Sequence, residues 1–203
     1  DGARVVDAHR GATVIAVDIP IGLSDCGGRL ADSLARGFVG GKRASSVFST
    51  PVRGILDAQT QPEASRRHFE IDGRKFGAHP FAILPKIREW DDLLRTDTEA
   101  CKRVREIHPE VSFAALAGGM GLPESKRTPE GASVRKALLS PVFGHEVVDS
   151  LLARVPRQWA ATDDVLDALV ALWSAERIAR GEARTLPEPA VSDSCGMVCA
   201  LHF

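Results

Sequence analysis

The chain has 203 residues, of which 44% are hydrophobic and 26% are charged, so it can bury the core of one domain and is not expected to be disordered. Its 26 Lys and Arg nearly balance 27 Asp and Glu, for a formal net charge of -1, so a nucleic acid or another anion would have to meet a local basic patch. No apolar run approaches the roughly 20 residues of a membrane span, which excludes a membrane protein of that kind.

The cysteines and the first residues of the chain indicate where the protein is located and whether its first strands are present. The four cysteines are scattered without CxxC spacing or a histidine at zinc-site distance, and no secretory pattern opens the sequence, so we expect reduced thiols and a cytoplasmic location. The chain starts without an initiator methionine, and a polar lead precedes its first strand-like segment. This leaves open that the first strand or strands of the fold are missing.

The first expected element is a buried strand over Thr13–Gly22, a β-branched run that ends in Pro and Gly. Asp18 lies near its carboxyl end, which is where ligands gather in open α/β sheets. A carboxylate in such an apolar run needs a partner or a metal, although a hydrogen bond to the following turn is the simpler interpretation.

A basic stretch follows. Residues 28–37 are typical of a short helix, and Gly40–Arg53 is a glycine-started connection into a small strand. We predict phosphate contacts in this region, although solvated surface charge is the ordinary alternative for each residue taken alone. The candidates are Arg29, Lys42, Arg43 and Arg53.

Residues 61–79 are polar and irregular, and residues 81–95 place apolar side chains at helical spacing around Pro85. We therefore expect a single domain over residues 1–203 with a helical or irregular insertion around residues 55–100. Lys86 is a further candidate for a phosphate contact, although it is equally typical of a solvated helix face.

A second strand is expected from Val104 to Ile107, followed by a helix that begins near Pro109. Alternation puts Glu106 and His108 on the same side of this strand end. Glu110 falls in the first helical turn, where the helix dipole alone favours a carboxylate, and a lone histidine such as His108 is usually a structural residue.

Helices are expected at 129–139 and 145–155, and another begins near residue 161 and runs to about 180. The last of these carries Asp163, Asp164 and Asp167. A helix advances roughly 100° per residue, so Asp164 and Asp167 share a face lined by small residues. Thr162 suits an N-cap, and capping with the helix dipole explains Asp163 and Asp164 without any function. Asp167 lies beyond the first turn and escapes that explanation.

A final strand is expected near residues 197–201 after a Pro-rich connection, and the alternating strand and helix signals predict a three-layer α/β domain. If the acidic helix crosses near the strand ends, Asp18, Glu106, Asp164 and Asp167 converge. Such carboxylates suit Mg²⁺ or Mn²⁺, and two ions roughly 4 Å apart can activate a water and stabilise the leaving oxygen of a phosphodiester.

Several of these segments together resemble the family catalogued as domain of unknown function 429, which is predicted to contain RNase H-like nucleases. The likeness rests on Val17–Leu23, Ser45–Arg53, Pro85–Glu89, Glu106–Phe113 and Asp163–Ala168. The last segment is also similar to the Asp-x-x-Asp-Ala helix of Holliday-junction resolvases. One departure is that no strand with the superfold's usual first catalytic Asp precedes Asp18 at the expected distance.

The resemblance implies an RNase H-like three-layer fold with a mixed central sheet and flanking helices, and a metal-dependent nuclease that leaves a 5′-phosphate. It implies Asp18, Glu106, Asp164 and Asp167 as catalytic, metal-binding carboxylates for Mg or Mn. Asp163, Glu110 and His108 rank second, and Lys86 is a phosphate contact. The expected partner is RNA or DNA, with the oligomeric state left open.

Two other functions remain open from the sequence. A non-catalytic nucleic-acid-binding or regulatory module would keep the fold without binding a metal, and the missing first Asp favours it. A phosphotransferase of the related actin-like superfold is the third hypothesis, and the lack of glycine-rich phosphate loops disfavours it.

Overall fold

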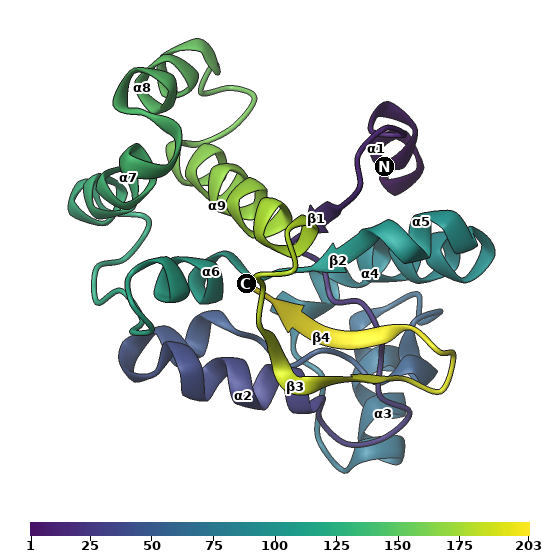
Figure 1. Ribbon diagram of the computed structural model, residues 1–203. Coiled ribbons are helices and arrows are strands. Elements are labelled where there is room, and N and C mark those ends of the chain that lie inside the picture. The colour runs from purple at the N-terminus through teal and green to yellow at the C-terminus, as the bar shows by residue number, and fades with distance from the viewer.

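The computed structural model describes residues 1–203 as a mixed α/β structure in which helices surround a small amount of β-structure (Figure 1). The helices are α1 (Gly2–Ala8), α2 (Leu30–Val39), α3 (Gln61–Asp72), α4 (Ala78–Thr96), α5 (Thr98–Arg103), α6 (Pro109–Leu116), α7 (Pro129–Phe143), α8 (His145–Arg154) and α9 (Thr162–Ala179). Short 3₁₀ segments are η1 (Gly41–Ser46) and η2 (Arg53–Ile55), and the strands are β1 (Ile15–Val17), β2 (Val104–Glu106), β3 (Thr185–Ser192) and β4 (Val198–His202).

The β-structure consists of two pairs of strands. β1 and β2 are parallel, with Val17 opposite Glu106, and β3 and β4 form an antiparallel hairpin. β4 lies beside β2, where His202 Nδ1 is 3.3 Å from the carbonyl oxygen of Glu106. The chain is therefore α/β as expected, with two small sheets where a larger mixed sheet was predicted.

β1 is much shorter than the apolar run that predicted it. Pro20 has no N–H to give to a strand neighbour, and the Ile21 N–H donates to the side chain of Glu106 at 2.7 Å. The ladder therefore ends at Val17, and Asp18 begins a turn at the carboxyl end of the parallel pair.

Three other segments differ from the sequence expectation. The polar lead is helix α1, because Asp1 caps it by accepting from the Arg4 N–H at 2.8 Å. The connection after Gly40 forms a 3₁₀ turn and no strand. The Pro-rich segment after Leu186 belongs to β3, whose prolines are tolerated because β3 pairs on one side only.

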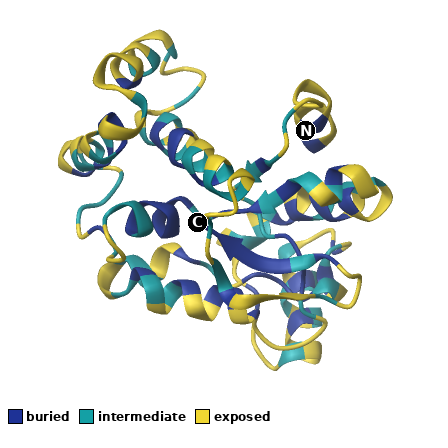
Figure 2. Cartoon of the chain, viewed as in Figure 1, coloured by how far each residue is buried: buried dark blue, intermediate teal, exposed yellow.

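The long helix α9 is held in place by buried side chains. Leu166, Leu169 and Val170 pack in one apolar cluster with Phe113 of α6 and Leu139 of α7. Figure 2 shows this buried face of α9 and the more exposed outer faces of α7 and α8. The Ser174 hydroxyl also donates to Ser112 on α6 at 2.8 Å. Asp167 on this helix feels the charge of Asp18, so α9 passes close to the end of β1.

The region around residues 55–100 folds as α3 and α4, which share an apolar cluster with η2 through residues such as Ile55, Phe76 and Leu84. All four cysteines are free thiols. No helix has both the length and the apolar character needed to cross a membrane.

Candidate active site

A cleft of about 520 Å³ opens at the carboxyl ends of β1 and β2, between η1, the start of α6 and the loop that precedes α7. Its walls carry both acidic and basic side chains. The charged and ionisable lining residues are Asp18, Lys42, Arg43, His79, His108, Glu110, Lys126 and Arg127. A cleft with carboxylates between cations is suited to an anionic ligand that is bound together with a metal ion.

Asp18, a candidate ligand residue of the sequence analysis, lines this cleft from the turn after β1. Its side chain is accessible to water but lies in a recess crowded by protein atoms. The resulting loss of solvation raises the pKa of the Asp18 carboxyl, and the charges of His108 and Lys126 oppose the shift. The fold therefore keeps a carboxylate where its charged form is disfavoured.

Asp167 of α9 forms an ion pair with Lys126, whose Nζ lies 2.6 Å from Asp167 Oδ2. The other oxygen, Asp167 Oδ1, is buried and has no hydrogen-bond partner. Burial raises the pKa of the Asp167 carboxyl against the effect of Lys126, and the charges of Asp18 and Glu110 raise it further. Asp167 thus belongs to a group of mutually repelling carboxylates.

Lys126 is the cation within this group. Burial opposes its charged form, but the hydrogen bond to Asp167 and the charges of Asp167, Asp163 and Asp18 outweigh that effect and raise the pKa of the Lys126 ammonium. The side chain retains about a third of its exposure. Lys126 therefore occupies a position at which three carboxylates favour positive charge.

Asp163 and Asp164, the other two acids of α9, lie in different environments. Asp163 precedes Asp167 by one helical turn and contributes to the field at Lys126. Asp164 is exposed and accepts a hydrogen bond from the Ala161 N–H at 2.8 Å, which makes it a helix cap. Ala161, and not Thr162, is the N-cap residue. The structure thus brings Asp163 toward the cleft and leaves Asp164 outside the cluster.

Glu110 and His108 lie at the start of α6. Glu110 is buried, accepts from Arg135 at 2.7 Å through Oε1, and leaves Oε2 without a partner. Arg135 is completely buried, so it holds Glu110 from the interior side. His108 Nε2 lies 3.3 Å from the Ser46 carbonyl oxygen on η1, while its Nδ1 is buried and unpaired. Of the three predicted second-rank residues, Glu110 and His108 line the cleft and Asp163 does not.

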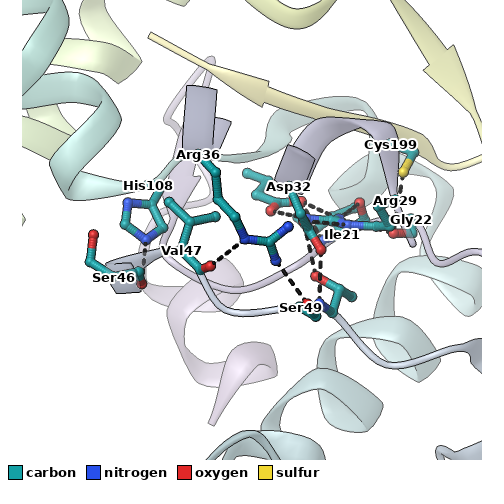
Figure 3. A network of polar contacts seen from close by, with 12 residues as sticks. Ile21, Gly22, Arg29, Asp32, Arg36, Ser46, Val47, Ser49, His108 and Cys199 are labelled. Carbon is teal, nitrogen blue, oxygen red and sulfur yellow. Dashed lines mark hydrogen bonds and ion pairs between the residues drawn. The ribbon is translucent and has the colours of Figure 1, made fainter. Parts of the chain in front are cut away.

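Glu106 has a different role from the one predicted for it. Its two oxygens accept from Arg29 at 2.6 and 2.8 Å, and Oε2 also accepts from the Ile21 N–H. Arg29 is 3% exposed, also donates to Asp32 at 2.7 Å, and bonds the carbonyl oxygens of Ile21 and Gly22, as Figure 3 shows. The carboxylates of this network raise the pKa of Arg29 despite its burial. Glu106 and Arg29 are thus paired with each other inside the protein, below the cleft.

Of the basic residues predicted to contact phosphate, some line the cleft and others are paired with acids away from it. Lys42 and Arg43 line the cleft. Arg53 is engaged by Asp91 at 2.7 Å and by Asp193 at 2.5 Å, which ties α4 to the β3–β4 turn. Lys86 pairs with Glu89 on α4 at 2.9 Å and does not line the cleft. Lys42 and Arg43 are therefore the members of the predicted set that a ligand in the cleft can contact. Arg127, which was not in that set, also lines the cleft.

Sequence reasoning missed Lys126, Arg127 and Arg135 as site residues. Lys126 and Arg127 form a short basic loop, which was a visible signal, but nothing in the sequence indicated that this loop faces Asp18 and Asp167. Arg135 is one of two neighbouring cations on α7, Arg135 and Lys136, and no motif marks it. Its role depends on Gly131, where a Cβ would lie 1.9 Å from the Ser125 carbonyl oxygen, so α7 approaches the basic loop closely.

The carboxylates around the cleft do not form a complete metal site, but their oxygens suit a divalent cation. No three His, Cys, Asp or Glu side chains surround one point as a ready metal site. The chemistry of the donors nevertheless suits Mg²⁺ or Mn²⁺, because Asp167 Oδ1 and Glu110 Oε2 are buried carboxylate oxygens without partners. Asp18, Asp163, Asp167 and Glu110 are the residues that would hold the ion, and Lys126 provides the cation among them.

The chain belongs to the family described as a protein of unknown function, DUF429, whose model matches residues 2–192. This confirms the family to which the sequence motifs pointed. No curated protein and no solved structure matches the chain.

Removing the charge of Glu106 tests its structural role. Glu106→Gln breaks a buried ion pair and leaves Arg29 with one carboxylate, so we expect the free energy of unfolding to fall by about 3–5 kcal/mol in urea titrations. The control is Glu99→Gln, whose partner Lys102 is exposed and whose loss should leave stability near that of the parent. Equal stability of the two variants would contradict the structural role.

The raised pKa of Asp18 predicts a pH dependence. The folded protein holds the Asp18 proton more tightly than the unfolded chain, so the free energy of unfolding falls as pH rises from about 4 through the raised pKa. Asp18→Asn removes this loss of stability, so its free energy of unfolding should exceed the parent's at pH 7, with a smaller difference at pH 4. Urea unfolding at both pH values measures the free energy of unfolding, and Asp92→Asn on the exposed side of α4 is the control. An Asp18→Asn variant whose stability follows the parent's pH profile would refute the expectation.

Proposed function

We propose that this protein is a metal-dependent nuclease that hydrolyses phosphodiester bonds. The observation that carries the proposal is the cleft itself, in which Asp18 and Glu110 lie beside Lys42, Arg43 and Arg127. Asp167 does not line the cleft, but it pairs with the cleft residue Lys126 and feels the charges of Asp18 and Glu110. Buried carboxylate oxygens without partners favour a hard cation, and cations at the rim favour a phosphate.

The proposed metal-binding set is Asp18, Asp163, Asp167 and Glu110. It keeps Asp18 and Asp167 from the sequence prediction. Glu110 and Asp163 replace Glu106 and Asp164, because Glu106 is bound by Arg29 and Asp164 caps α9. An RNase H-like fold remains part of the proposal. It is supported by a parallel strand pair with an acid at its carboxyl end and by a later helix that brings a second acid to it.

The side chains would divide the work of hydrolysis. Mg²⁺ or Mn²⁺, when bound, supplies Lewis-acid stabilisation of charge on the phosphate and lowers the pKa of water. Lys42, Arg43 and Arg127 bind and orient the phosphate from the rim. Arg135 fixes the Glu110 carboxylate from the interior through the 2.7 Å bond, and the packed face of α9 fixes Asp167.

Cleavage assays test the proposal. The purified protein with Mg²⁺ or Mn²⁺ should cut at least one of single-stranded DNA, single-stranded RNA, duplex, hybrid or four-way junction substrates. Asp18→Asn and Asp167→Asn should each reduce the rate by about 100-fold or more, because metal catalysis supplies several kcal/mol. Asp92→Asn is the matched control on an exposed helix face and should retain the rate. No cleavage of any substrate, or full activity of both site variants, would end the proposal.

A second candidate is a non-catalytic nucleic-acid-binding module. The observation that favours it is Lys126, whose ammonium already pairs with Asp167 at 2.6 Å and supplies a cation to the carboxylates. In such a module Lys126 would replace the metal permanently.

Calorimetric titration with Mn²⁺ separates the two candidates. A nuclease should bind Mn²⁺, and Lys126→Met should bind it several-fold more tightly, because the competing ammonium is gone and its repulsion is removed. Lys136→Met, on α7 and paired with Asp149, is the control and should match the parent. Failure of both the parent and Lys126→Met to bind Mn²⁺ would favour the module.

A further inference from the structure

A second hollow of about 470 Å³ adjoins the cleft and shares Lys42 and Arg43 with it. We call it the side groove. It is bounded by the carboxyl end of α2 with the start of η1 and, opposite, by the loop after α6. Its lining residues are Phe38 to Arg43 and Gly119 to Pro123. The shared cations make the cleft and the side groove neighbouring compartments with Lys42 and Arg43 between them.

The walls of the side groove are held together by a close backbone approach. A Cβ on Gly121 would lie 1.9 Å from the Val39 carbonyl oxygen, so only glycine permits the loop to lie directly on the end of α2. Figure 1 shows the loop after α6 passing this end of α2. The Gly119 N–H also donates to the Ala114 carbonyl oxygen at 2.8 Å, which anchors the loop to α6. The hollow is therefore a built feature of the fold.

Apart from Lys42 and Arg43, the side groove is lined by apolar residues and glycines, and it contains no acid. Met120 is 75% exposed, more than most of the chain's large hydrophobic side chains. Phe38 is half-buried and its ring lies 4.9 Å from that of Phe203, which fixes its orientation. Glycines on both walls leave the surface without side chains that would obstruct a flat ligand. These features suit a planar, uncharged group attached to an anion.

We propose that the side groove binds an unpaired nucleobase of a single-stranded substrate, next to the nucleotide in the cleft; this rests on the proposed nuclease function. A phosphate between Lys42 and Arg43 would join the two nucleotides. The base would lie against Met120 and Phe38, because stacking and apolar contact are how proteins hold single strands without reading sequence. A paired base within a duplex cannot enter, since its faces and edges are already occupied.

Binding assays without metal test this inference separately from catalysis. Fluorescence anisotropy of labelled six-nucleotide oligothymidine and oligouridine is measured in EDTA, with a blunt duplex long enough to remain fully base-paired as comparison. The parent should bind at least one single strand more tightly than the duplex. Met120→Asn should weaken that binding by about 5-fold or more, as loss of base contact predicts, while Met120→Leu should keep it.

The control for a general effect of surface polarity is Val147→Asn, an exposed apolar position on α8. It should bind like the parent. Equal affinities of Met120→Asn and Val147→Asn for the single strands would overturn the inference, as would tighter binding of the duplex.

The outcomes also separate the inference from the function on which it rests. Cleavage of duplexes with no effect of Met120→Asn on single-strand binding would refute the side groove and leave the nuclease. Binding that depends on Met120 without cleavage of any substrate under Mg²⁺ or Mn²⁺ would support the side groove and refute the nuclease.

Discussion

The buried ion pair between Arg29 and Glu106 is the interaction on which the rest of the structure depends. Arg29 is the N-cap residue of helix α2, and Glu106 ends strand β2, 77 positions later in the chain. The same guanidinium bonds the carbonyl oxygens of Ile21 and Gly22 in the turn after β1. The start of α2, the end of β2 and the turn after β1 are thus fixed to one cation.

The carboxylates near the ends of β1 and β2 are of two kinds, those with hydrogen-bond partners for both oxygens and those without. Glu106 accepts three hydrogen bonds, two from Arg29 and one from the Ile21 N–H, so both of its carboxylate oxygens have partners inside the protein. Asp167 and Glu110 each leave one buried carboxylate oxygen without a hydrogen-bond partner. The pKa of Asp18 is raised because its carboxyl has lost part of its solvation. Under the proposed function, a bound cation would supply the partner that these carboxylate oxygens lack.

The sequence predicted much of the framework and part of the site. The strand at Val104, the helices after Pro109 and Pro129 and the acidic helix were predicted from apolar spacing and caps, and Asp18 was placed from its position after an apolar run. The separation of Asp163 from Asp164 was not predictable, because it depends on which carboxylate turns back to the Ala161 N–H. Lys126 was missed for a similar reason: its partner Asp167 lies 41 positions away, and only the packing of α9 on α6 and α7 brings them together.

The phosphate candidates illustrate the same limit. Four basic residues flank the first strand, yet Arg29 and Arg53 are bound by acids distant in the sequence, whereas Lys42 and Arg43 remain at the cleft. Composition could suggest a basic patch, but only tertiary pairing decides which cations are available to a ligand.

The most direct test of a cation site among these carboxylates is a crystal structure of the protein grown with Mn²⁺, using the anomalous scattering of the ion. The account predicts an anomalous peak among Asp18, Asp167 and Glu110, with Lys126 moved away from Asp167. Saturating Mn²⁺ with no peak there, and with the Lys126–Asp167 pair intact, would contradict it.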